Sequence, residues 1–226
     1  MNKYCLYSLL LGYLPGCILT AEIVCRKLTG KSASELGTSG NPGMANVMAH
    51  LGFKPGLIVL AGDLGKCVLS CLAAWFLFGR DGALAGDPGI GRAAILWAGL
   101  GCTAGHDFPF WRGFRGGKGV AASCIAMFLG DPLTGLIANI AGMLTVFATK
   151  YLALGGLVIP AVYAVLIYLW RGVDCAVPAI GFLLLTLITH RKSLMQIPAG
   201  TAEKVDVLGA IKRKFGGKKA PEDLKQ

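Results

Sequence analysis

The sequence predicts an all-α, polytopic membrane protein, a bundle of about seven transmembrane helices. Of its 226 residues, 54% are hydrophobic, only 15% are charged and 33 are glycine, and long apolar runs alternate with short polar gaps. Soluble domains carry about 25% charged residues and about 7% glycine. Glycine at contacts between helices lets transmembrane helices approach closely. The composition therefore predicts one membrane-embedded unit, which we assign to residues 1–203, followed by a polar basic tail at 204–226.

Seven apolar runs predict the helices, since a hydrocarbon core requires about 17 to 25 helical residues. They span residues 4–24, 56–78, 90–105, 120–129, 133–149, 151–170 and 175–189. The third and fourth are short and need flanking residues, so six or eight helices are alternative counts. Residues 4–24 are interpreted as a retained helix and not a cleaved signal peptide, because further apolar runs follow and Pro15 and Glu22 interrupt the signal pattern.

The distribution of basic residues predicts the orientation. With seven helices, 17 lysines and arginines lie on the side of the C-terminal tail and four lie on the other side. The positive-inside rule then predicts an N-terminus outside and a cytoplasmic tail. The charges lie between apolar runs and are not interleaved with aromatic residues, so the net charge of +10 does not predict nucleic-acid binding.

The eight cysteines lie almost entirely within apolar runs and include no Cys-x-x-Cys pair. We interpret them as small packing residues and expect no metal and no other cofactor. Two Gly-x-x-x-Gly repeats, at residues 12–16 and 101–105, predict close helix contacts, although this signal has low specificity in a glycine-rich chain.

A first polar stretch, residues 37–46, combines glycines that allow tight turns with polar side chains. Backbone N–H groups exposed by such turns bind anions. An ordinary surface turn is the alternative. The candidate ligand-binding residues of this stretch are Ser39, Gly40, Asn41, Gly43 and Asn46.

A second stretch, residues 105–119, places a lysine among glycines immediately before an apolar run. Exposed amides and an ammonium group at a helix N-terminus favour phosphate binding. It is not a Walker A loop, because Lys118 is followed by Gly119 and position 112 is an arginine. A flexible positively charged loop is the alternative. The candidate residues are His106, Gly116, Gly117, Lys118 and Gly119.

A third stretch follows the last apolar run and contributes His190, Arg191 and Ser193, although basic residues also simply mark a cytoplasmic helix end. Asp63 and Lys66 lie one turn apart inside the second run. Because buried charges in a membrane usually pair, we predict a structural ion pair there, with a proton relay as the alternative.

Together, these stretches resemble the acyl-phosphate:glycerol-3-phosphate acyltransferase family (PlsY type). Residues 39–47 (SGNPGMANV) are similar to its first motif, and residues 105–109 (GHDFP) with 115–121 (RGGKGVA) match its second. The third motif matches only in His190 and Arg191. Asp63 and Lys66 resemble its Asp-x-x-Lys element. The resemblance implies seven spans in a bacterial inner membrane and a site that faces the cytoplasm.

The resemblance also implies transfer of a fatty acyl group from acyl phosphate to glycerol 3-phosphate, giving lysophosphatidic acid in phospholipid synthesis. Ser39 and Lys118 would act in catalysis, with His106 or a substrate phosphate taking the hydroxyl proton. The other candidate residues would bind substrate. The implied partners are the two substrates or a related phosphorylated alcohol, membrane lipid and an enzyme that supplies acyl phosphate.

The chain departs from the family at positions that help to hold the acceptor. Expected Thr, Arg, Asn and Arg residues are replaced by Ala45, Ala49, Ser193 and Gln196. His50 is a possible replacement for the arginine missing at Ala49. Two alternatives therefore stand beside the enzyme: a catalytically impaired relative that uses another acceptor or binds lipid, and a small membrane transporter.

Overall fold

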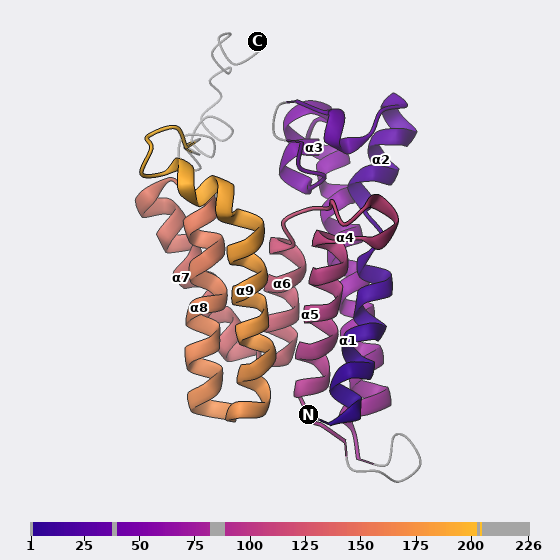
Figure 1. Cartoon of the computed structure of the whole chain (residues 1–226), viewed down its shortest axis with the longest axis vertical. Helices are drawn as coiled ribbons and strands as arrows, with labels where there is room; N and C mark the ends of the chain where they lie inside the picture. The colour runs from indigo at the N-terminus through magenta and orange to yellow at the C-terminus, as the bar shows by residue number, and fades with distance from the viewer. Residues whose placement is uncertain (1, 38–39, 82–88, 203, 205–226) are drawn as a thin grey trace.

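The computed structural model describes residues 2–37, 40–81, 89–202 and 204, and the regular structure within these ranges is helical. The helices lie side by side in one bundle (Figure 1). The α-helices are α1 (Lys3–Gly16), α2 (Thr20–Thr29), α3 (Met44–Leu51), α4 (Phe53–Ala74), α5 (Ala93–Asp107), α6 (Val120–Gly130), α7 (Pro132–Thr149), α8 (Leu152–Arg171) and α9 (Val173–Gln196). Single turns lie at η1 (Ala33–Glu35), η2 (Trp75–Gly79) and η3 (Phe110–Arg112). The basic tail at 205–226 lies outside the described residues.

The fold confirms the predicted class of helical membrane protein. Five segments are long and apolar enough to cross a bilayer: Lys3–Thr29, Phe53–Gly79, Pro132–Thr149, Leu152–Arg171 and Val173–Gln196. The 15-residue α5 and the 11-residue α6 are shorter. Because α5 packs against α1, α4, α6 and α9, protein and not lipid buries most of it. The count of seven spans and the orientation stay predictions.

Glycines bring α1 and α5 into close contact, as the two Gly-x-x-x-Gly repeats predict. A methyl group at Gly12, Gly16, Gly101 or Gly105 would overlap backbone atoms of the facing helix. Close backbone approach increases dispersion contact, which replaces the hydrophobic effect between helices in lipid. These glycines therefore hold the end of α5 against the end of α1.

The first predicted helix is wrong in one respect, because residues 4–24 form two helices and not one. Helix α1 ends at Gly16 and α2 begins at Thr20. Pro15 has no N–H to donate, which weakens the helix before the break. The carbonyl oxygens freed there are bonded by distant side chains: Lys66 Nζ lies 3.1 Å from Gly16 O and 2.7 Å from Ile18 O, and Trp111 Nε1 lies 2.7 Å from Cys17 O.

The main hydrophobic core joins α4, α5, α6, α7, α8 and α9. Its largest side chains include those of Leu96, Met127, Tyr163, Ile167 and Phe182. All eight cysteines carry free thiols, and four of them (Cys67, Cys71, Cys102 and Cys175) pack in this core. Large apolar side chains such as Leu69 and Leu169 remain exposed on the outside of the bundle, where a bilayer would cover them.

Candidate active site

The three polar stretches lie at one end of the bundle. The segment that joins α2 to α3, the loop between α5 and α6, and the C-terminal end of α9 share the end opposite to the N-terminus (Figure 1). Hydrogen bonds join them. Lys118 Nζ donates to Ser193 Oγ at 3.1 Å, and Arg112 donates to Ser34 Oγ at 3.2 Å. The fold therefore brings together segments that lie about 75 residues apart in sequence.

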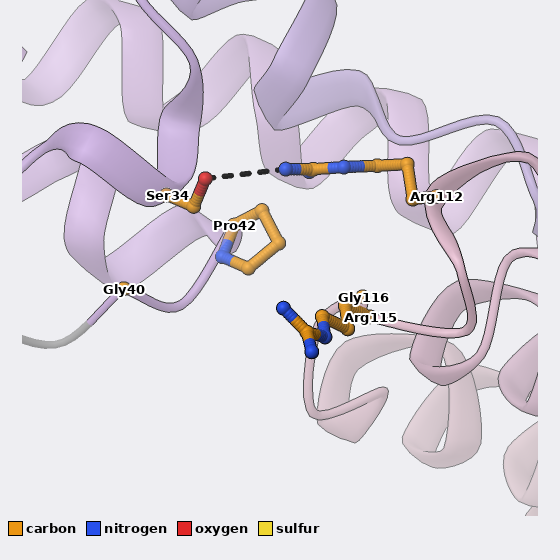
Figure 2. A pocket seen from close by; sticks show the side chains of 6 residues that line it. All are labelled: Ser34, Gly40, Pro42, Arg112, Arg115 and Gly116. Carbon is orange, nitrogen blue, oxygen red and sulfur yellow. Dashed lines mark hydrogen bonds between the residues drawn. The ribbon is translucent and has the colours of Figure 1, made fainter.

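A cavity of about 390 Å³ lies between the first two stretches. Figure 2 shows Ser34, Gly40 and Pro42 on one side and Arg112, Arg115 and Gly116 on the other. The guanidinium of Arg112 reaches across to Ser34. Arg112 pairs with Glu22, whereas Arg115 makes no ion pair within the described part of the chain. A guanidinium such as that of Arg115 favours an anionic ligand and matches the oxygen geometry of phosphate.

The first stretch forms a tight turn before α3. Gly40 has a φ of +59°, which favours glycine, and Gly43 N donates to Asn41 O at 2.9 Å. The Asn46 side chain is buried, and its Nδ2 donates to the carbonyls of Ala33 and Leu36 at 3.2 and 3.1 Å. This amide therefore holds η1 against α3. Ser39 lies outside the described residues.

The second stretch folds back onto the end of α5. The N–H groups of Gly116 and Gly117 donate to Asp107 O and His106 O, both at 2.9 Å, so these two amides are already bonded. A methyl group at Gly117 would overlap the His106 imidazole. Gly119 has a φ of +61°. The glycines thus let the loop pack directly on α5. From the sequence, they had instead been explained by exposed amides that bind phosphate.

His106 lies beneath this loop and not at its surface. It is 4% exposed, and its Nδ1 lies 3.0 Å from Lys66 Nζ. Lys66 also forms the predicted ion pair with Asp63, with a 3.0 Å distance from Nζ to Oδ1. Since an ammonium group only donates, Nδ1 of His106 accepts. This imidazole therefore belongs to a buried polar cluster.

In the third stretch, one side chain bonds to the second stretch and another is buried in the bundle. Ser193 contacts Lys118, as described above. His190 is 4% exposed, and its Nδ1 lies 3.1 Å from Thr186 O, within the same helix. Arg191 is exposed. Ser193 is thus the member of this stretch that contacts the second one directly.

Sequence reasoning missed four residues of this region: Glu22, Ser34, Arg112 and Arg115. Arg115 was read as part of the second motif and Arg112 as evidence against a Walker A loop, but neither was named as a candidate site residue. Nothing in the sequence linked Glu22 and Ser34 to Arg112, which lies 90 and 78 residues away from them. Among the described residues, no group of three His, Cys, Asp or Glu side chains is placed to hold a metal ion.

The fold and site define a class: an integral membrane protein of packed helices with an arginine-lined cavity at one end. A family model described as glycerol-3-phosphate acyltransferase matches residues 6–200. The chain is 34% identical to glycerol-3-phosphate acyltransferase 1 of Lactobacillus johnsonii, covering 92% of this chain and 96% of that protein. It is 31% identical to the glycerol-3-phosphate acyltransferase of Thermoanaerobacter pseudethanolicus, covering 92% and 100%.

A solved structure gives the same result. The glycerol 3-phosphate form of PlsY (YgiH), an integral membrane glycerol 3-phosphate acyltransferase, superimposes with a TM-score of 0.76 at 26% identity, covering 92% of this chain and 98% of that one. The lysophosphatidic acid form shares the fold with a TM-score of 0.74 at 24% identity. The chain belongs to the glycerol-3-phosphate acyltransferase family.

Proposed function

We propose that this protein transfers a fatty acyl group from acyl phosphate to the 1-hydroxyl of glycerol 3-phosphate. The acceptor oxygen forms an ester bond with the acyl carbonyl carbon, the bond from that carbon to the phosphate oxygen breaks, and lysophosphatidic acid and phosphate leave. The observation that carries the proposal is the arginine-lined cavity between the first and second stretches in a chain of this family. The acceptor follows from the family to which the chain belongs, and the donor from the resemblance of its motifs to the PlsY type.

The chemistry needs few residues, because an acyl phosphate is a mixed anhydride with a good leaving group. The site has to hold two anionic substrates together and stabilise charge on the carbonyl and the departing phosphate. Lys118 and Arg115 supply positive charge on the second stretch, and Arg115 makes no ion pair within the described part of the chain. Ser39, Gly40, Asn41 and Gly43 are proposed to contact substrate from the first stretch.

The hydroxyl proton is proposed to pass to a substrate phosphate. The alternative acceptor, His106, is buried, its Nδ1 already accepts from Lys66, and Gly117 lies against the ring. A general base has to come within about 3 Å of the proton that it removes, or reach it through one water. We therefore propose that His106 supports the second stretch. Asn46 and His190 are also buried, and we propose that they support the first and third stretches, respectively.

The active end is proposed to face the cytoplasm of a bacterial inner membrane. All three polar stretches lie at that end, together with basic residues such as Arg112, Arg115 and Lys118, which fits the positive-inside rule. Soluble glycerol 3-phosphate would reach the site from that side, together with acyl phosphate from a supplying enzyme. The fatty chain would lie among the helices, where apolar groups partition readily.

The test uses purified protein in detergent or liposomes. With acyl phosphate and glycerol 3-phosphate, we expect phosphate release and lysophosphatidic acid in equal amounts, measured by a phosphate assay and mass spectrometry. Lys118→Ala should lower the rate about 100- to 1000-fold, as loss of one charge-stabilising donor does. Cys124→Ala, a change in the helix that follows, is the matched control and should stay active. Equal rates in both variants, or product only from an acyl thioester, would contradict the proposal.

A shifted acceptor is the second candidate, and the replaced positions motivate it. Ala45 and Ala49 are exposed on one face of α3, so neither offers a polar group there. The assay should therefore be repeated with several small phosphorylated alcohols. If acceptor binding has drifted, Ala49→Arg should lower KM for glycerol 3-phosphate without a large change in kcat. An unchanged KM would exclude this position from acceptor selection.

A further inference from the structure

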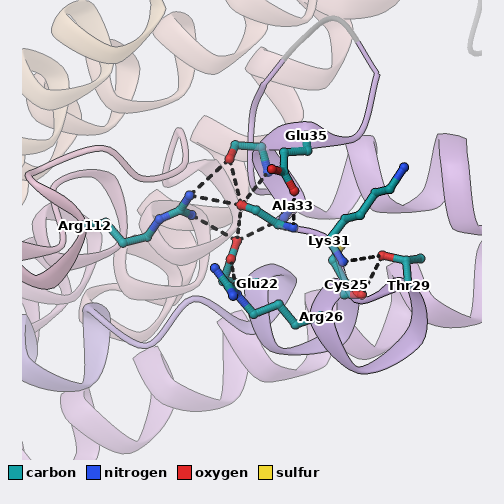
Figure 3. Close-up of polar contacts among 10 residues, drawn as sticks. Glu22, Cys25, Arg26, Thr29, Lys31, Ala33, Glu35 and Arg112 are labelled. Carbon is teal, nitrogen blue, oxygen red and sulfur yellow. Dashed lines mark hydrogen bonds and ion pairs between the residues drawn. The ribbon is translucent and has the colours of Figure 1, made fainter.

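One buried carboxylate joins the two sides of the cavity. Glu22, on α2, is 3% exposed and accepts four hydrogen bonds. The donors are Arg26 Nε at 2.6 Å, Arg112 Nη1 at 3.1 Å, Ser32 Oγ at 3.0 Å and the Ala33 N–H at 3.0 Å (Figure 3). With its oxygens bonded in this way, the carboxylate is held rigidly.

Arg112 provides the contact from the opposite side. One guanidinium nitrogen donates to Glu22, and the other donates to Ser32 Oγ and Ser34 Oγ, both at 3.2 Å. Its side chain is only 17% exposed. A planar guanidinium that donates in two directions fixes position as well as charge. We call Glu22, Arg112, Ser32 and Ser34 the Glu22–Arg112 network.

The network spans the cavity of the proposed site. Ser34 lies in η1, which leads directly into the stretch with Gly40, and Arg112 lies in η3, which leads into the stretch with Gly116. Ser34, Gly40, Arg112 and Gly116 all line the cavity. The distance between the two stretches is therefore set by bonds between Arg112 and η1.

The charge of Arg112 is already balanced within the network. Binding a substrate phosphate directly would require this arginine to leave Glu22, and a buried carboxylate that loses its partner is costly. Arg26 also pairs with Glu22, but from the same helix and with a side chain that is 63% exposed. Arg112 is thus the partner of Glu22 that connects separate parts of the chain.

We propose that Arg112 is a positioning residue for acyl transfer, which acts through Glu22, Ser32 and Ser34 to hold the first and second stretches at the separation that brings the two substrates into contact. This inference rests on the proposed function. It adds four side chains to the machinery, none of which was among the candidate site residues read from the sequence. A misplacement of about 1 Å in a reacting pair lowers the rate about 100-fold, so the expected effect is on kcat.

The test compares three variants by steady-state kinetics. Arg112→Met should lower kcat about 10- to 100-fold while each KM changes less than about threefold. Arg112→Lys, which keeps the charge but has one donor group in place of the fork, should fall between Arg112→Met and wild type. Arg26→Met is the matched control: it removes another cation from Glu22 without separating the two stretches, and its kcat should stay within about twofold of wild type.

Two kinetic outcomes would overturn the proposal. A higher acceptor KM with unchanged kcat in Arg112→Met would make Arg112 a substrate ligand. Equal losses of kcat in Arg112→Met and Arg26→Met would show that transfer depends on the charge balance at Glu22 and not on the link between the first and second stretches. If Arg112→Met is too unstable to purify, Ser34→Ala removes one bond of the network, and an unchanged kcat there would equally refute the proposal.

Hydrogen–deuterium exchange gives a measurement that is independent of activity. Amides in residues 33–36 and 108–117 should exchange faster in Arg112→Met than in wild type, and at the wild-type rate in Arg26→Met. Unchanged exchange rates in Arg112→Met would show that the Glu22–Arg112 network does not hold the two stretches together. If the wild-type protein transfers no acyl group but the exchange rates change as expected, the proposed function fails and the structural link stands.

Discussion

Replacing Lys66 with methionine should strongly destabilise the protein, because it removes the cation from the buried polar cluster of Asp63, Lys66 and His106. The ammonium lies 3.0 Å from the Asp63 carboxylate and 3.0 Å from His106 Nδ1, and it donates to the carbonyls of Gly16 and Ile18 at the break between α1 and α2. Both charged side chains are at most 7% exposed. Methionine keeps the length and the apolar stem but none of these bonds.

The magnitude follows from the buried charge that remains. Removing one partner of a buried ion pair costs about 3–5 kcal/mol, because the other charge stays in the interior without compensation. In a protein of this size, each kcal/mol lowers the melting temperature by about 2–4 °C, so the expected decrease is about 6–20 °C. Asp63→Asn combined with Lys66→Met removes both charges and should recover at least about half of the loss, since the amide oxygen of the new asparagine could still accept from Thr20.

Thermal unfolding of the purified protein in one fixed detergent measures this difference. Lys54→Met, at an exposed lysine of the same helix, is the control and should melt within about 2 °C of wild type, as surface substitutions usually do. A Lys66→Met protein that melts with wild type, or a double variant as unstable as the single one, would refute the argument that the ion pair is buried and mutually dependent.

Two further predictions test the loop packing and the other end of the bundle. Gly117→Ala should abolish transfer while the protein still folds in the membrane, because its methyl group would displace the loop from His106; wild-type kcat would contradict this. At Asp131, burial alone would raise the pKa of the carboxyl, but hydrogen bonds from Thr134 and from Arg171 at 2.8 Å outweigh burial and hold the pKa below its usual value. The stability that this ionised group contributes is lost as pH falls through the lowered pKa, so melting temperature should fall below about pH 4 in wild type and fall less in Asp131→Asn.

Local chemistry explains how far sequence analysis reached. Apart from the break after Gly16, the apolar runs predicted helices correctly, because the burial of backbone polar groups in lipid forces hydrogen bonding within each segment. The glycine repeats in α1 and α5 also behaved as expected, since the absence of a side chain is itself the signal. The polar stretches, read as ligand-binding loops, do meet at one end of the fold.

The functions of individual polar residues were harder to predict. Asn46 and His106 looked like ligand-binding groups, yet their side chains bond to the protein itself. Glu22 interrupted an apolar run and gave no further hint, although it is a central acceptor at the cavity. A residue type shows which bonds are possible, and only packing shows which partners are within reach.

The sequence alone therefore determined the helical membrane class, the three stretches and the family they resemble, because these depend on composition and on residues close together in the chain. The tertiary structure decided the break after Gly16, the pairing of Lys118 with Ser193 and the network around Glu22. These features depend on bonds between groups as much as 94 residues apart, and their geometry exists only after the helices have packed.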